Sequence, residues 1–283
     1  MPRPALVLIL AMGLISLPAA LFADDLRAKA PETAFSGKLR PDILGISTES
    51  TAESSRAIFD TLFRGRTDTQ TDIQQQKSGH GTSYVAALNF TLPAGPKQNG
   101  EMLSTCFSAP ASTNRAYFVA RNLTFAQDQQ PSKADMIKDV MGKYGVPTIV
   151  GDQHLYYIYR KGSIMSVGGK YKEATALEAI DKPLDPRAAV KLNGDTVRGS
   201  CVAVIKRAQA KVRDPGAMLI EAKGANCDGV LSVQLVPGTQ ADRVGIAQFT
   251  LLDVKQLISA AAIDRAAAGQ GDGQMPTGST PKL

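Results

Sequence analysis

The chain has 283 residues, of which 43% are hydrophobic and 20% are charged, so it can form one large or two modest domains with a buried core. The formal net charge is +6, but the densest basic stretch, residues 206–213, has no interleaved aromatic side chains that could stack on bases. The composition therefore argues against a nucleic-acid partner, and the absence of tryptophan argues against an aromatic platform for sugars.

The N-terminus has the three parts of a secretory signal peptide. Arg3 supplies a positive charge, residues 5–17 form an apolar run, and Ala23 offers a small residue at the cleavage position. Cleavage there removes residues 1–23, leaves no membrane span, and exports the chain to the periplasm or the medium. A retained membrane anchor is the alternative, which Pro18 disfavours because proline breaks a helix.

The next part of the chain predicts one helix followed by strands. Residues 24–40 are polar and aperiodic, which indicates a loose leader. A helix is expected from Ser50 or Thr51, whose hydroxyl groups can cap the first turn, to Gly65. Residues 66–81 are rich in Gln, Thr, Asp and Gly, which predicts an exposed loop. Alternating apolar residues then predict three strands, at 84–92, 102–108 and 115–125.

A polar segment, QDQQPS at residues 127–132, is the clearest candidate for a domain boundary. We therefore expect one module over residues 24–127 and a second over residues 128–268. Ser132 can cap a helix at the start of the second module, and Gly145 can end it in the left-handed conformation.

A strand is predicted directly after this helix, where Leu155, Tyr157 and Tyr159 alternate with the residues between them. The order of YGVPT and then LYYIYRKG, within Pro131 to Gly162, resembles the pattern of the SmpA/OmlA outer-membrane-assembly lipoproteins and of the β-lactamase-inhibitor-protein superfamily. The resemblance implies a non-catalytic periplasmic module that binds other proteins. The chain departs from the lipoproteins because no cysteine lies near the cleavage position.

The C-terminal part predicts a second set of strands and a closing helix. Turn residues divide residues 161–199 into two or three turns with short strands. The helix is expected at Leu257 to Ala268 with Asp253 as its cap, and residues 269–283 have too few apolar side chains to form a core, which predicts a disordered tail. Runs rich in Val, Ile and Leu predict strands at Cys201 to Ile205, Met218 to Ala222, Gly229 to Val236 and Val244 to Leu252.

This order of elements predicts an α+β fold. We expect one or more antiparallel sheets with the helices on one face, and the order of elements allows two modules that each place a helix before a meander.

Catalytic motifs are missing from the sequence. It contains no Gly-x-Ser-x-Gly, Ser-x-x-Lys or His-Glu-x-x-His motif, and only two histidines, His80 and His154. Cys106 could serve as a nucleophile beside either histidine, although its apolar neighbours favour a buried, inert thiol. No catalytic residue, metal ligand or cofactor site is therefore assigned from the sequence.

The three cysteines suggest one disulfide, because an exported chain meets an oxidising compartment. Cys201 and Cys227 lie in the same half of the chain, near predicted strands that could be adjacent, so we expect them to be joined and Cys106 to stay reduced.

The function favoured by these features is that of an exported, non-enzymatic protein that binds another periplasmic or envelope protein or has a structural role. A periplasmic hydrolase with a Cys/His or carboxylate site is the alternative.

Overall fold

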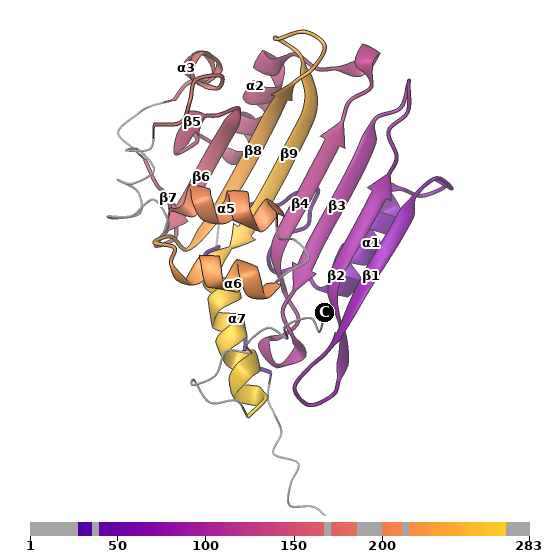
Figure 1. The fold of residues 1–283 in the computed structure, drawn as a ribbon, viewed down its shortest axis with the longest axis vertical. Helices are drawn as coiled ribbons and strands as arrows, with labels where there is room; N and C mark the ends of the chain where they lie inside the picture. The colour runs from indigo at the N-terminus through magenta and orange to yellow at the C-terminus, as the bar shows by residue number, and fades with distance from the viewer. Residues whose placement is uncertain (1–27, 36–39, 167–170, 186–199, 211–214, 270–283) are drawn as a thin grey trace, which may run out of the picture.

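The computed structural model describes residues 28–35, 40–166, 171–185, 200–210 and 215–269. The predicted signal peptide and the tail from residue 270 lie outside these residues. A single antiparallel sheet of nine strands, in the order β1-β2-β3-β4-β9-β8-β6-β5 with β7 paired to β6, runs through the molecule (Figure 1). The strands are β1 (Gln70–Lys77), β2 (Ser83–Leu92), β3 (Gly100–Phe107), β4 (Ala116–Thr124), β5 (Ile149–Gly151), β6 (His154–Arg160), β7 (Ser163–Ile164), β8 (Gly229–Pro237) and β9 (Val244–Asp253).

Helices cover both faces of the sheet, so the α+β prediction is confirmed while the expectation of helices on one face is wrong. One buried cluster joins α1, α2 and α3 to one face, and a second joins α5, α6 and α7 to the other (Figure 1). The helices are α1 (Ala52–Leu62), α2 (Lys133–Tyr144), α3 (Glu173–Ala179), α5 (Cys201–Ala210), α6 (Pro215–Lys223) and α7 (Val254–Ala267), with short 3-10 turns at η1 (Pro110–Ser112) and η2 (Gln127–Gln129).

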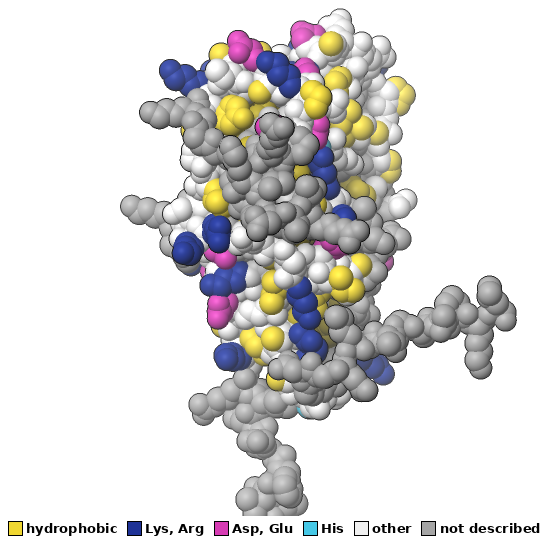
Figure 2. Space-filling view, turned by 60° about the vertical axis from the view of Figure 1, so that its left-hand side comes forward, with side chains coloured by type: hydrophobic (Ala, Val, Ile, Leu, Met, Phe, Trp, Pro, Cys, Tyr) yellow, Lys and Arg dark blue, Asp and Glu magenta, His cyan; other side chains and the backbone are white. Residues whose placement is uncertain are grey.

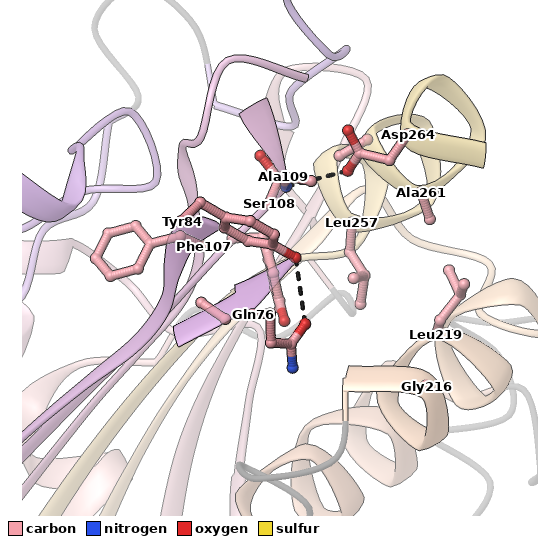
Figure 3. A pocket seen from close by; sticks show the side chains of 13 residues that line it. Gln76, Tyr84, Phe107, Ser108, Ala109, Gly216, Leu219, Leu257, Ala261 and Asp264 are labelled. Carbon is pink, nitrogen blue, oxygen red and sulfur yellow. Dashed lines mark hydrogen bonds between the residues drawn. The ribbon is translucent and has the colours of Figure 1, made fainter. Parts of the chain in front are cut away.

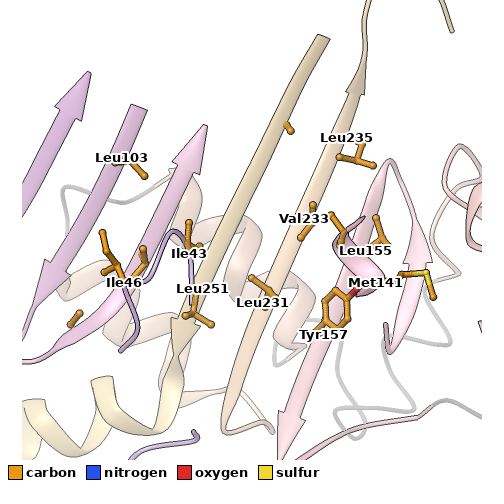
Figure 4. Close-up of a cluster of buried hydrophobic side chains, with 14 of the residues drawn as sticks. Ile43, Ile46, Leu103, Met141, Leu155, Tyr157, Leu231, Val233, Leu235 and Leu251 are labelled. Carbon is orange, nitrogen blue, oxygen red and sulfur yellow. The ribbon is translucent and has the colours of Figure 1, made fainter. Parts of the chain in front are cut away.

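The central strands are apolar on both faces because both faces are covered. In β6, Leu155 and Tyr157 belong to the cluster on the α2 side, whereas Tyr156 and Ile158 belong to the cluster on the α5 side. Figure 4 shows Leu155 and Tyr157 beside Leu231 of β8 in the first cluster. Strand β6 is therefore buried along nearly its whole length.

Two segments predicted as strands are helical. Cys201 to Ile205 lies in α5 and Met218 to Ala222 lies in α6. An apolar run of five residues fits a buried strand and the inner side of a helix equally well, and the helical outcome depends on residues beyond the run. Residues 161–166 and 171–185, predicted to contain turns and short strands, contain the short β7 but also α3; residues 167–170 and 186–199 lie outside the described residues.

The strands of both predicted modules belong to the same sheet, because β4 pairs with β9 along seven register positions, from Phe118 to Thr124. The module boundary at residues 127 and 128 stays a prediction. Within the second module, the helix end signals are confirmed. The Ser132 side chain accepts from the Asp135 N–H at 3.0 Å, and Gly145 follows α2 with a φ of 84°.

Residues 28–35, expected to belong to a loose leader, pack against the fold. Phe35 is 2% exposed, and its ring meets the Tyr159 ring edge to face with centroids 4.9 Å apart. The segment is tied to α7 through the buried carboxylate of Asp253, which accepts from the Ala34 N–H at 3.1 Å and from the Gln256 N–H at 2.8 Å. Asp253 is the predicted cap of the last helix, and it also fixes the N-terminal segment.

The face of the molecule seen in Figure 2 carries both signs of charge. Figure 2 shows Lys and Arg side chains spread over the face in view, with Asp and Glu side chains between them. Among the described residues, no helix has the length and apolar character that a membrane span requires.

Candidate functional site

Strand β1 forms one edge of the sheet and is open along its outer side. It has eight residues, seven of them exposed, and its register partners all lie on β2 (Figure 1). No strand within the described part of the chain pairs with the other side of β1. Because N–H and C=O groups alternate between the two sides of a strand, this edge presents a row of backbone donors and acceptors to solvent.

The opposite edge of the sheet is closed. Strand β5 has only three residues, and the segment after α3 lies against its end. The Asp152 N–H donates to the Lys182 carbonyl at 2.8 Å and the Gln153 N–H to the Ile180 carbonyl at 2.7 Å. A Cβ atom on Gly151 would lie 3.1 Å from the Leu184 Cα, so the chain passes close to this edge. The two edges therefore differ, and only β1 can accept a further strand of useful length.

A groove lies where the end of the β1–β2 hairpin meets α6, α7 and the η1 turn. Its deeper part is a cavity of about 180 Å³, and Figure 3 shows Tyr84, Leu219 and Leu257 around it. The Tyr84 hydroxyl donates to Gln76 Oε1 at 3.2 Å across one side of this cavity (Figure 3). The deeper cavity is lined by Gln76, Tyr84, Ala86, Phe107, Ser108, Ala109, Tyr117, Gly216, Leu219, Leu257, Ala260, Ala261 and Asp264.

The outer part of the groove is larger, at about 530 Å³, and shares much of its wall with the deeper cavity. This volume lies within the roughly 300–1,000 Å³ common for small-molecule sites. Ile220 lies at its rim with 60% of its side chain exposed, the largest exposure among the big hydrophobic residues described. The further residues that line only the outer part are Lys77, Ser78, Gly79, Ile220, Lys223, Arg265 and Ala268.

The groove is electrostatically positive at its outer part. Lys77, Lys223 and Arg265 line it, and none of the three makes an ion pair with a carboxylate of the described residues. The Arg265 Nε donates to the Ala261 carbonyl of its own helix at 3.1 Å, which leaves the other guanidinium N–H groups available.

Asp264 is the one carboxylate among the described residues that line the groove, and it has a structural role. It accepts from the Ala109 N–H at 3.1 Å, from the Ser112 N–H at 3.0 Å and from the Ser112 hydroxyl at 2.9 Å. Burial raises the pKa of Asp264, and the hydrogen bonds from Ser112 and Ala109 oppose that rise. These bonds fix η1 to α7, and a single committed carboxylate does not provide the acid and base pair of a hydrolase.

The residues weighed as a Cys/His site lie apart. His154 is on β6 and Cys106 on β3, so β4, β9 and β8 separate them by about 19 Å across the sheet. His80 is exposed in the turn before β2. The register partner of Cys106 is Ala87, which lies roughly 14 Å along β2 from the start of that strand. Neither histidine can therefore activate Cys106 in this fold, and burial raises the pKa of its thiol to about 12.

His154 has a structural environment of its own. Its Nδ1 lies 2.6 Å from the Asp152 carbonyl oxygen, and its ring stacks on Tyr156 with centroids 5.0 Å apart. Burial lowers the pKa of His154, so the neutral ring is favoured. No group of three or more His, Cys, Asp or Glu side chains suited to a metal ion occurs in the described ranges.

The expected disulfide is present between Cys201 and Cys227, whose Cα atoms are 6.2 Å apart. The pairing predicted from the sequence is confirmed, although Cys201 begins helix α5 rather than a strand. The bond therefore ties the start of α5 to the turn that precedes β8.

No protein-family model and no solved structure matches this chain. The resemblance of residues 131–162 to the SmpA/OmlA lipoproteins and the β-lactamase-inhibitor-protein superfamily therefore stays a prediction.

Sequence reasoning missed both surfaces. Strand β1 was interpreted as a loop because QTDIQQQK has one large apolar residue and no alternation. The groove unites residues 76–84 with residues 216–268, and the sequence holds no signal that these segments meet. In the structure, the unusual exposure of Ile220 marks the rim of the groove. This exposure cannot be inferred from the sequence, where Ile220 lies within an apolar run.

Proposed function

We propose that the protein is exported and acts without catalysis, by binding an extended segment of another envelope protein along the edge of β1. The observation that carries this proposal is the open edge itself, which is eight residues long and, within the described ranges, is paired on one side only. An extended peptide that adds a strand satisfies this row of backbone groups, and main-chain hydrogen bonds then provide affinity.

The polar composition of β1 disfavours indiscriminate pairing of its open edge with other strands. Four of its eight residues are glutamine, and Asp72 and Lys77 add opposite charges, so the strand stays hydrated before it meets a partner. Ile73 is 42% exposed and offers one apolar contact to an added strand. Export is supported by the tripartite N-terminus and by the disulfide, since disulfides persist in oxidising compartments.

The enzyme alternative has less support. Cys106 lies far from both histidines, and the groove lining contains a single carboxylate whose oxygens already accept hydrogen bonds from η1. Binding through backbone groups needs no reactive side chain, which agrees with the missing catalytic motifs.

Site-specific photo-crosslinking in the periplasm tests the proposal. A photoreactive residue at Gln75 on β1 should join the protein to an envelope protein, whereas the same residue at the exposed Lys138 on α2 should not. Intact-mass measurement of the recovered protein should show the loss of residues 1–23. Recovery only of a species that retains Arg3 would contradict cleavage of a signal peptide after residue 23.

Two adjacent proline variants test whether the outer edge of β1 is responsible for the Gln75 crosslink. Consecutive strand residues point their N–H groups to opposite sides, so one of Thr71→Pro and Asp72→Pro removes a bond to β2 and the other removes only an outward donor. The variant that keeps the wild-type melting temperature should lose the Gln75 crosslink. A crosslink that persists in that variant, or that joins only two copies of this chain, would overturn the proposal.

A further inference from the structure

We propose that the groove beside the hairpin end binds a long-chain fatty acid, with the end of its alkyl chain in the deeper cavity, the rest of the chain along the outer part and its carboxylate at Lys77, Lys223 and Arg265. This site adjoins the end of β1 at Gln76 and Lys77, but it does not depend on the function proposed for the outer edge of that strand. The proposal rests on the shape, the apolar wall and the charge of the groove.

The deeper cavity suits a single alkyl chain. Its wall contains the aromatic ring of Phe107 and the side chains of Leu219 and Leu257, with Ala260 and Ala261 on α7 (Figure 3). The small side chains of α7 allow a narrow space next to the helix, which takes one chain more readily than the two chains of a phospholipid. Burial of an alkyl chain contributes about 0.8 kcal/mol for each methylene group removed from water.

The outer part of the groove suits an anionic head. Lys77, Lys223 and Arg265 come from three different elements and have no carboxylate partner in the described ranges. A carboxylate placed among them gains the charge-assisted hydrogen bonds that these side chains lack. Because Asp264 already accepts three hydrogen bonds from η1, it competes little for the three cations.

The arrangement also orients the ligand. Exposed cations lie at the mouth of the groove and apolar side chains lie at its deeper end, so the chain enters first and the head stays near solvent. The Tyr84 hydroxyl and the Gln76 amide already bond to each other, and a ligand with an apolar tail leaves that pair intact.

Displacement of a fluorescent fatty acid from the delipidated full chain tests the proposal. Palmitate should displace 11-(dansylamino)undecanoic acid, and hexadecanol and hexadecyltrimethylammonium should displace it at least tenfold less well. A lysophospholipid distinguishes the two sources of an anionic amphiphile, a free fatty acid and a single-chain phospholipid. Because its phosphate head is larger, the lysophospholipid should bind more weakly than palmitate.

Variants locate the site. Lys223→Gln combined with Arg265→Gln should weaken palmitate binding by about tenfold, since each exposed ion pair contributes modestly. Lys138→Gln removes a charge of the same kind from α2 and should leave binding unchanged. Ala261→Phe should fill the groove and abolish binding, with circular dichroism to show that the variant is folded.

Three results would overturn the assignment. They are the absence of palmitate binding, equal affinity of the double variant and Lys138→Gln, and tighter binding of hexadecanol or the lysophospholipid than of palmitate.

Discussion

Asp253→Ala is expected to lower the free energy of unfolding by about 4 kcal/mol at pH 5, from the lost helix cap and from buried N–H groups left without an acceptor. The carboxylate is fully buried at the start of α7. It accepts from the N–H groups of Ala34 and Gln256 at 3.1 and 2.8 Å, and its Oδ2 lies 2.6 Å from the Thr33 hydroxyl. Urea unfolding followed by circular dichroism measures the change.

The pH dependence of the same group provides a second measurement. Burial raises the pKa of Asp253 from 3.8 to about 6, against the opposing effect of its hydrogen bonds. The folded state therefore binds a proton more tightly than the unfolded state, so this contribution to stability is complete below pH 3.8 and is lost as the pH rises through 6. The loss caused by Asp253→Ala should accordingly shrink between pH 5 and pH 8.

Asp253→Asn is the matched control. Asparagine keeps an oxygen acceptor for the Gln256 N–H but cannot titrate, so this variant should unfold with a smaller loss than Asp253→Ala and without the pH dependence described for the acid. Equal stability of the wild-type protein and Asp253→Ala at pH 5 would contradict the role assigned to the carboxylate.

Loss of the disulfide should have the second large effect. Cys201 and Cys227 are 26 positions apart, and closing a loop of this length stabilises the folded state by about 3.5 kcal/mol in the chain-entropy model. The double variant Cys201→Ser and Cys227→Ser should therefore unfold at lower urea concentration. Release of α5 from the turn before β8 should also free the start of that helix, which hydrogen exchange can follow.

Treatment with a reductant distinguishes the contribution of the Cys201–Cys227 bond to stability from that of the buried Cys106 thiol. Wild-type protein should lose stability in dithiothreitol, and the double serine variant should not respond further. Mass spectrometry of a non-reducing digest should recover the peptides of Cys201 and Cys227 joined. A digest in which either is joined to Cys106 would show that the pairing is wrong.

The two proposed binding surfaces meet at Gln76 and Lys77, which lie at the end of β1 and line the groove. A strand added to β1 and a ligand in the groove would therefore contact the same two residues at the end of β1. The variants proposed for each surface distinguish them, because the adjacent prolines lie five or six residues from Lys77 and the charge variants lie on α6 and α7.

Local elements with clear ends were predictable from the sequence. The helix after Ser132 has a capping hydroxyl, an apolar stripe and a terminal glycine, and each of these signals acts within a few residues. The strands β2, β3 and β4 are rich in apolar residues and bounded by turn residues, and they were predicted within two residues of their observed ends. The disulfide partners were also predictable, because few cysteines were available and two of them lie in one half of the chain.

Elements without a distinctive local signal were wrong or missed. Cys201 to Ile205 and Met218 to Ala222 are apolar runs too short to separate a strand from a helix. Strand β1 is polar, and its extended conformation comes from backbone pairing with β2 rather than from its side chains.

The sequence by itself determined the class of fold, the main caps and strands, and the cysteine pair, because each depends on neighbouring residues or on a small set of choices. The tertiary structure alone decided that helices cover both faces, that β4 pairs with β9, that β1 is an open edge and that α6, α7 and the hairpin form a groove. The pairing of β4 with β9 and the groove join segments more than a hundred residues apart, and the free energy of such contacts is not encoded in any local pattern.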